Sequence, residues 1–252
     1  MKIPLSLIVI TLNEEDNIER CIRSVPFASE VLVVDSHSQD RTGEVASALG
    51  ARVLQKSWMG YGPQKKFATE QARFDWVLSL DADEVLSPEL QTEIENRFSS
   101  LDPKVGYEMP RKSWYLGRWI LHGGWYPDYQ LRLYNRQHSN WPDSQIHERV
   151  RASQVERMNS PLLHYVFRDL ADQVATNNRY SSLLAQKDLE AGKRFSLLKL
   201  MVKPWTKFLE TYFLKLGFLD GRAGLIISVS AAYSIFLRWA KISELKEKGS
   251  SR

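Results

Sequence analysis

The first hundred residues alternate short apolar runs with stretches whose apolar residues recur at helical spacing. Short runs rich in β-branched residues predict buried strands, and recurrence at three and four residues predicts amphipathic helices. The strands are expected at residues 5–10, 31–34, 53–54 and 76–80, and the helices at 18–25, 41–49, 64–72 and from Pro88 onward. This alternation favours right-handed crossovers, so the predicted fold is an α/β fold with a mostly parallel sheet and helices on both faces.

Polar clusters follow three of these predicted strands. Asn13-Glu14-Glu15 follows the first strand, Asp35-Ser36 the second and Asp81-Ala82-Asp83 the fourth. Ligands of open α/β sheets bind beyond the carboxyl ends of the strands. We therefore expect the three clusters to converge on one cleft.

From about Gly106 the helical periodicity fades and aromatic residues become frequent, while residues 130–134 alternate like a strand. Two interpretations stay open: a cross-strand aromatic core, or a platform on which sugar rings stack while their hydroxyls bond to charged neighbours. On the second interpretation the acceptor-binding residues are Trp114, Trp119, Trp125, Arg118 and His122.

Residues 166–252 have helical patterns and carry most of the basic charge. Residues 192–252 hold 12 Lys+Arg against 4 Asp+Glu, whereas the net charge of the whole chain is only +4. Pro204 is expected to kink or split a helix there. The apolar stretch 223–237 would span only about 22 Å as a helix, short of the roughly 30 Å of a bilayer's hydrocarbon, so we expect it to be buried, interfacial or subunit-facing. An anionic membrane surface or a second copy of the chain could cover these helices, and no nucleic-acid partner is expected.

Composition places the chain among ordinary globular proteins. Hydrophobic residues make up 43% and charged residues 25% of the 252 residues, and the mean hydropathy is -0.36. These values exclude a disordered chain, a collagen and a multi-span transporter. The single cysteine, Cys21, cannot form an internal disulfide, so a reducing cytoplasm is the expected compartment.

The pair Asp81 and Asp83 indicates a bound cation. Two carboxylates at the end of a buried strand are costly to hold together unless a hard divalent ion, Mg²⁺ or Mn²⁺, neutralises them, and such an ion completes its shell with phosphate oxygens. No Gly-x-Gly-x-x-Gly or Gly-Lys-Ser/Thr loop follows an early strand, so a dinucleotide oxidoreductase and a P-loop NTPase are excluded. A haloacid-dehalogenase-like phosphatase using Asp81 and Asp83 stays an alternative, as does a non-catalytic scaffold that binds carbohydrate or membrane.

Three stretches resemble the motifs of family 2 glycosyltransferases with the GT-A fold. They are Thr11-Leu12-Asn13-Glu14-Glu15, the stretch from Val33 to Thr42, and Leu80-Asp81-Ala82-Asp83-Glu84. The later stretches 117–120, 124–128, 147–148, 164–165 and 217–222 are similar to the bacterial branch that adds glucose to heptose in the lipopolysaccharide inner core. One departure is His37, which stands where many relatives have a small residue, commonly glycine.

The resemblance implies a peripheral enzyme on the inner face of the cytoplasmic membrane that transfers a hexose from a nucleotide sugar, UDP-glucose, to a glycolipid or oligosaccharide acceptor with inversion. It implies a nucleotide-sugar half at residues 1–105, an acceptor-binding and catalytic half at 106–165, and a helical extension at 166–252. The nucleotide-binding residues would be Thr11, Asn13, Glu15, Asp35, Asp81, Ala82 and Asp83. Asp83 and His147 would hold the metal.

An inverting transfer needs a carboxylate that removes the proton of the attacking acceptor hydroxyl. Asp128 is the first candidate, because it precedes the strand that contains Arg132, and Glu148 is the second. Arg132 would either hold the leaving diphosphate or pair with Asp128.

Overall fold

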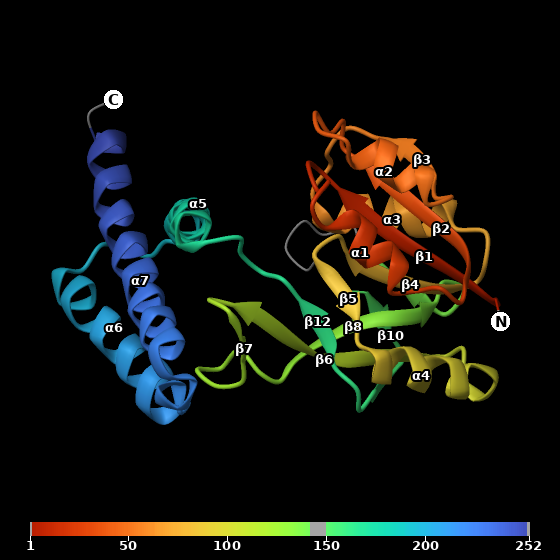
Figure 1. The fold of residues 1–252 in the computed structure, drawn as a ribbon. Helices are drawn as coiled ribbons and strands as arrows, with labels where there is room; N and C mark the ends of the chain where they lie inside the picture. The colour runs from red at the N-terminus through yellow and green to blue at the C-terminus, as the bar shows by residue number, and fades with distance from the viewer. Residues whose placement is uncertain (1, 142–149, 251–252) are drawn as a thin grey trace. The chain divides into compact units, whose positions relative to one another are not determined.

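The computed structural model describes residues 2–141 and 150–250, and it divides the chain into two compact units. The first unit comprises Met1–Arg111 and Asp128–His164, and the second comprises Lys112–Pro127 and Tyr165–Arg252 (Figure 1). Each unit has its own core.

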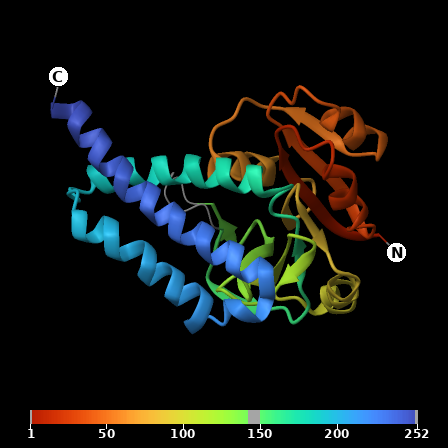
Figure 2. The same ribbon diagram turned by 60° about the vertical axis from the view of Figure 1, so that its left-hand side comes forward.

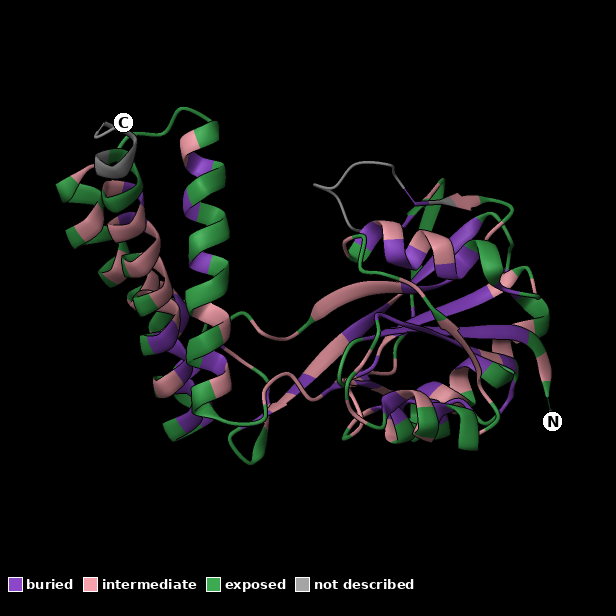
Figure 3. Cartoon of the chain, turned by 90° about the horizontal axis from the view of Figure 1, so that it is seen from above, coloured by how far each residue is buried: buried purple, intermediate pink, exposed green. Residues whose placement is uncertain are grey.

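The first unit contains the predicted α/β sheet. Its parallel half has the order β3-β2-β1-β4, formed by β1 (Ile3–Thr11), β2 (Ala28–Asp35), β3 (Arg52–Gln55) and β4 (Trp76–Asp81). Every strand that the apolar runs predict is present, and each extends beyond its run by one to three residues at one or both ends. Buried residues line these strands (Figure 3).

Helices cover both faces of this half, as expected. Leu5, Leu7 and Val9 of β1 belong to one core with α1 (Ile18–Arg23), α2 (Thr42–Ala48) and α4 (Pro88–Arg97). Ile8 and Ile10 belong to a second core with α3 (Tyr61–Gln71). Neighbouring β1 side chains point to opposite faces, so one apolar strand serves both cores. The predicted α/β class is confirmed.

The rest of the sheet is mostly antiparallel, so the sheet as a whole is mixed. β8 (Asp128–Asn135) pairs with β4 and with β6 (Val105–Tyr115), and β12 (Leu162–His164) pairs with β5 (Glu84–Leu86). The shorter strands β7 (Arg118–Ile120) and β11 (Gln154–Arg157) pair with β6, whereas β9 (Ser139–Asn140) and β10 (Arg151–Ala152) form a separate two-stranded sheet. This pairing places strands from distant parts of the sequence beside the end of β4.

Three helices dominate the second unit: α5 (Leu170–Glu190), α6 (Leu197–Leu209) and α7 (Gly221–Ser250). α7 packs against both others (Figure 2). A π-helical turn, Glu210–Leu214, and a 3₁₀ turn, Gly217–Asp220, connect α6 to α7. A Cβ on Gly224 would lie 1.8 Å from the carbonyl oxygen of Gly217, so this close approach requires glycine.

One of the two alternatives for Pro204 is wrong, because α6 is continuous from Leu197 to Leu209 and Pro204 does not split it. The helix that contains the apolar stretch 223–237 is 30 residues long, so the stretch alone understated its length. By length and composition, Gly217–Lys246 could cross a membrane, with 28% of the apolar window buried.

Candidate functional site

The register of the parallel strands brings the predicted polar clusters to one edge of the sheet. Thr11 pairs with Asp35 across β1 and β2, and Ile10 pairs with Asp81 across β1 and β4. The ends of three strands are therefore level, and their following turns lie at the same edge. The expected convergence of the clusters is what the structure shows.

Asp81 is held between two buried cations. Its Oδ1 lies 2.6 Å from Lys65 Nζ of α3, and its Oδ2 lies 2.6 Å from an Arg132 guanidinium nitrogen of β8. Burial raises the pKa of Asp81, but the charges of Lys65 and Arg132 outweigh it and hold that pKa well below its ordinary value. Asp81 is thus a fixed negative charge at the sheet edge.

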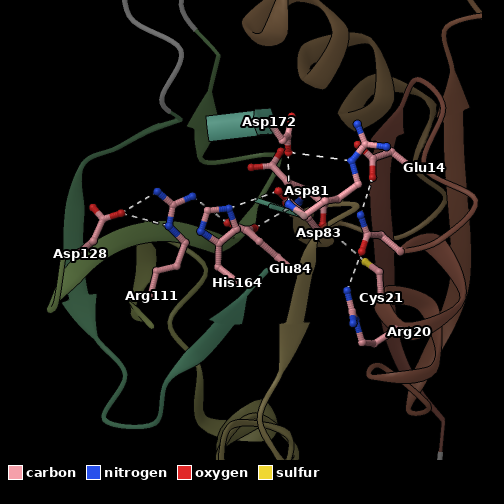
Figure 4. A network of polar contacts seen from close by, with 12 residues as sticks. Glu14, Arg20, Cys21, Asp81, Asp83, Glu84, Arg111, Asp128, His164 and Asp172 are labelled. Carbon is pink, nitrogen blue, oxygen red and sulfur yellow. Dashed lines mark hydrogen bonds and ion pairs between the residues drawn. The ribbon is translucent and has the colours of Figure 1, made fainter. Parts of the chain in front are cut away.

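Glu84, directly after the Asp-x-Asp motif, is fully buried beneath it. Its Oε1 accepts from Arg132 at 2.6 Å and from Arg111 at 3.1 Å, and its Oε2 accepts from the backbone nitrogen of Asp81 at 3.1 Å (Figure 4). Burial raises the pKa of Glu84, but the charges of Arg132 and Arg111 and the hydrogen bond from Arg132 together lower it below its ordinary value. The same two carboxylates raise the pKa of Arg132 against the effect of burial, so all three groups stay charged.

Asp128 lies at the far end of this network. Its Oδ2 accepts from Arg111 at 2.6 and 3.0 Å (Figure 4). Its Oδ1 accepts from Gln130 at 2.8 Å. Its side chain is 36% exposed. The alternative of an Asp128–Arg132 pair is wrong, because Arg132 reaches Asp81 and Glu84 and the arginine that pairs with Asp128 is Arg111. Asp128 is therefore oriented and open to solvent.

Asp83 faces a histidine that the sequence interpretation did not assign. His164 Nε2 lies 3.2 Å from Asp83 Oδ2, because β12 pairs with β5 immediately after the motif. His147 and Glu148, the expected metal ligand and second base, lie outside the described residues. Within residues 2–141 and 150–250 no group of three or more His, Cys, Asp or Glu could hold a metal by itself. Asp83 and His164 could supply two ligands, which fits an ion that takes its other ligands from a diphosphate and water.

The loop residues expected to line the nucleotide pocket bond mainly to one another. Asp35 accepts from Thr11 at 3.0 Å, from Gln55 at 2.9 Å, and from both the hydroxyl and the backbone nitrogen of Ser38. These donors occupy the roughly four lone-pair positions of a carboxylate, so a nucleobase must displace one of them.

Asn13 and Glu15 tie the first loop to the second. Asn13 Oδ1 accepts from the backbone nitrogen of Gln39 at 2.8 Å, and Glu15 Oε2 accepts from Arg41 at 3.1 and 3.2 Å. These bonds hold the turn after β1 beside the turn after β2 at the edge of the sheet where the parallel strands end. A positioning role for Asn13 and Glu15 is what the contacts support directly.

The backbone conformation at His37 explains why a small residue suits this position. Its φ is +61°, in the left-handed region that disfavours side chains with a Cβ. Asn13 has a similar φ of +57°, but asparagine tolerates this conformation better. The turn thus keeps its geometry with histidine, at some backbone strain.

The five expected acceptor-binding residues all fall in the second unit. Trp114 and Trp119 meet edge to face with ring centroids 5.1 Å apart, and Trp125 stacks on Tyr115 at 6.1 Å. Arg118 and His122 both contact Asp220, which is buried at the start of α7. The three tryptophans are only partly buried, so both the core and the platform interpretations retain support.

Four charged residues of the site were missed from the sequence: Lys65, Glu84, Arg111 and His164. Glu84 and His164 lie in the motifs 80–84 and 164–165, which give neither residue a role of its own, and Arg111 lies in the aromatic-rich stretch outside any motif. Lys65 is the first of two adjacent lysines in a predicted helix, and nothing in the sequence indicates that it is 5% exposed. Knowledge that this helix face is buried would have singled out Lys65, because a charged residue is almost never fully buried unless it is paired.

Cys21 lies beneath the motif as a buried free thiol. Its Sγ donates to the carbonyl oxygen of Asp81 at 3.6 Å. Burial raises the pKa of the thiol well above its usual range, and Glu84 adds to this effect. A protonated buried thiol packs as a small apolar side chain.

The geometry is that of an α/β enzyme with a charged site at the carboxyl ends of parallel strands. The chain belongs to glycosyl transferase family 2, whose model matches residues 6–159. An uncharacterised glycosyltransferase of Rickettsia typhi is 35% identical over 257 residues, covering 97% of this chain and 88% of that protein. The lipopolysaccharide core biosynthesis glycosyltransferase LpsC of Rhizobium meliloti is 32% identical over 249 residues, which cover 96% of this chain and 92% of LpsC.

Among solved structures, glucosyl-3-phosphoglycerate synthase of Mycobacterium tuberculosis in complex with Mn²⁺, UDP and glucosyl-3-phosphoglycerate is 26% identical with a TM-score of 0.35. The match covers 45% of this chain and 44% of the synthase chain. The predicted family is confirmed by the family model and the two relatives. The chain is a glycosyltransferase, which excludes the phosphatase and scaffold alternatives.

Proposed function

We propose that this glycosyltransferase moves a hexose, glucose from UDP-glucose, to a heptose of the lipopolysaccharide core with inversion at the anomeric carbon. The observation that carries the proposal is the continuous charged network Lys65–Asp81–Arg132–Glu84–Arg111–Asp128 at the strand ends. The network fixes two acids within the first unit: Asp81, on the nucleotide side, and Asp128, which is open to solvent. The relation to LpsC supports the acceptor class.

Asp128 acts as the base in this proposal. Arg111 and Gln130 fix both of its oxygens, so its carboxylate is aimed before the acceptor binds. It takes the proton of the acceptor hydroxyl while that oxygen bonds to the anomeric carbon and the bond to the diphosphate breaks. Glu148 remains the second candidate for this step.

Asp83 and His164 hold the divalent ion, Mg²⁺ or Mn²⁺, together with the donor's diphosphate. When bound, the ion neutralises charge on the departing diphosphate. Asp81 cannot offer a free oxygen on its Lys65 or Arg132 side, so its role is to position these two cations near the donor. Arg132 then contributes to the diphosphate site through charge rather than through an exposed contact.

The acceptor is a lipid-linked sugar, so the enzyme works at the inner face of the cytoplasmic membrane. The tryptophans 114, 119 and 125 with Arg118 and His122 contact the acceptor sugars. Partly buried indole rings beside charged side chains suit the apolar faces and hydroxyl edges of a sugar.

Transfer of glucose from UDP-glucose to a heptose-containing acceptor tests the base. Asp128→Asn should lower kcat by on the order of 10²–10⁴-fold and leave the KM for the donor unchanged. Asp75→Asn is the matched control, because Asp75 forms a comparable ion pair with Arg136 at the opposite end of β4. Near-normal transfer by Asp128→Asn, with loss in Glu148→Gln, would assign the step to Glu148.

A further inference from the structure

α6 presents an unusually large apolar face to solvent. None of its thirteen residues is fully buried, and Trp205 and Leu198 are 70% and 72% exposed. The strongly exposed apolar residues are Leu197, Leu198, Met201, Val202, Trp205 and Leu209. At about 100° per residue these six positions fill one arc of about 140° around the helix. A contiguous apolar face of this kind marks a binding surface.

Lysines lie on the opposite side of α6 from this arc. Lys199, Lys203 and Lys207 recur every four residues, and their stripe is centred about 170° from the middle of the apolar face. Lys215 and Arg222 follow in the connection to α7 and its first turn, where Phe213, Leu214, Phe218 and Leu219 are also exposed. A helix with an apolar face and a lysine-rich opposite face suits the plane of an anionic bilayer, with the apolar side chains at the acyl boundary and the cations toward the headgroups.

The contacts of α7 argue against a membrane-spanning helix. Arg238 pairs with Asp188 of α5 at 2.6 Å, and Lys241 donates to Asn178 and Ser181 of the same helix. α5 also carries many exposed charged and polar residues. If α7 crossed a bilayer with these contacts intact, α5 would carry its charges into hydrocarbon, which is very costly.

We propose that the second unit binds in the plane of an anionic phospholipid bilayer through the apolar face of α6, with α7 lying on the membrane rather than crossing it. Trp205 and Leu198 enter the acyl boundary, and Lys203 stays among the headgroups. This surface goes beyond the transfer reaction, and vesicle binding needs neither donor nor acceptor sugar. Its failure would therefore leave the proposed chemistry untouched, and an inactive enzyme could still bind vesicles.

Flotation of the full chain with vesicles tests the surface. We expect binding to vesicles of phosphatidylglycerol and phosphatidylcholine in equal parts, and release by an alkaline carbonate wash. The double variant Leu198→Glu/Trp205→Glu should lower vesicle partitioning by on the order of a hundredfold. Leu183→Glu is the matched control, because Leu183 is 58% exposed on α5 and should leave binding unchanged.

Two further variants keep the test sharp if the double variant folds poorly. Lys203→Glu should weaken binding to the anionic vesicles by on the order of tenfold and leave the weak binding to pure phosphatidylcholine unchanged. Trp205→Phe should retain binding but lose most of the fluorescence quenching by brominated phosphatidylcholine. Unchanged flotation of the double variant would overturn the proposal.

Two other results would replace it. If the protein resists the carbonate wash, α7 spans the bilayer. If the wild type is a dimer by light scattering, and Leu198→Glu/Trp205→Glu converts it to a monomer without changing flotation, the α6 face joins two copies of the chain.

Discussion

The two units of the chain depart from ordinary protein surfaces and cores in opposite ways. The first unit buries charge: Glu84 is 0% exposed and Arg132 is 7% exposed, and both lie at the strand ends. The second unit exposes large apolar side chains along α6. Buried charge and exposed apolar surface both lower stability unless something compensates for them. Each anomaly is the place where we propose that its unit meets a ligand.

The compensation differs between the units. In the first unit most of the compensation lies within the chain: each carboxylate oxygen of Glu84 has a donor, and among the described residues Arg132 Nε alone of this network is buried without a hydrogen-bond partner. Such a network adds little stability itself, but loss of one member leaves an unpaired charge. In the second unit the compensation must come from outside the chain. Changes to the first unit should thus affect folding, and changes to the α6 face should affect association.

The largest effect on folding should come from Arg132→Met. It leaves Asp81 and Glu84 without their shared cation, so the free energy of unfolding should fall by about 3–5 kcal/mol in urea titrations. Arg23→Met is the control, because Arg23 forms an exposed pair with Glu19 on α1 and should change the free energy by less than about 1 kcal/mol. Equal losses of unfolding free energy in both variants would show that the buried network contributes no more to stability than an exposed ion pair does.

Acid should weaken the first unit more than the second. Burial raises the pKa values of Asp81 and Glu84, but their cations lower them below those of the unfolded chain. The unfolded chain therefore takes up protons first, so this stability is fully present at neutral pH and is lost as the pH falls below about 5. Hydrogen exchange measured at decreasing pH should accelerate in β4 before it accelerates in α7. The reverse order would contradict the assignment.

A smaller effect, confined to the second unit, should follow Asp220→Asn. Asp220 is 1% exposed and accepts from the backbone nitrogens of Leu121 and His122 at 3.1 and 2.8 Å. Loss of its charge should cost about 1–3 kcal/mol and speed hydrogen exchange at the start of α7. Glu190→Gln at the exposed end of α5 serves as the control. Faster exchange in β1 and β4 as well would mean that the units are not independent.

The smallest effect should be a gain from His37→Gly. Relief of the left-handed strain is worth about 1–2 kcal/mol, and the extra freedom of glycine in the unfolded chain removes about half of this. The melting temperature should therefore rise by a few degrees at most. Gly50→Ala, at a φ of +80°, should lower it. A loss on His37→Gly would show that the imidazole has its own contact role.

Local pattern was enough to predict the parallel half of the sheet. Strands buried on both faces are apolar throughout, and the end of β4 follows because Asp81 interrupts such a run. The start of α4 also has a local signal, since Ser87 caps the helix and Pro88 occupies its first turn.

What the sequence did not reveal depends on packing between distant segments. Lys65 meets Asp81 only because α3 packs against the β1–β4 sheet, and His164 meets Asp83 only because β12 pairs with β5. The length of α7 was missed because the predicted stretch stopped before Arg238, whereas Arg238 pairs with Asp188 of α5 and the helix continues to Ile242, which is buried in a core with Ala185 of α5.

The thermal stability of the protein with UDP-glucose and Mn²⁺ tests the central claim most directly, because a ligand that binds only the folded state raises the melting temperature. We predict a rise when both are present, no comparable rise with either one, and no rise in Asp83→Ala. A rise that needs no divalent ion, or one that survives in Asp83→Ala, would contradict a donor site built on the carboxylates at the strand ends.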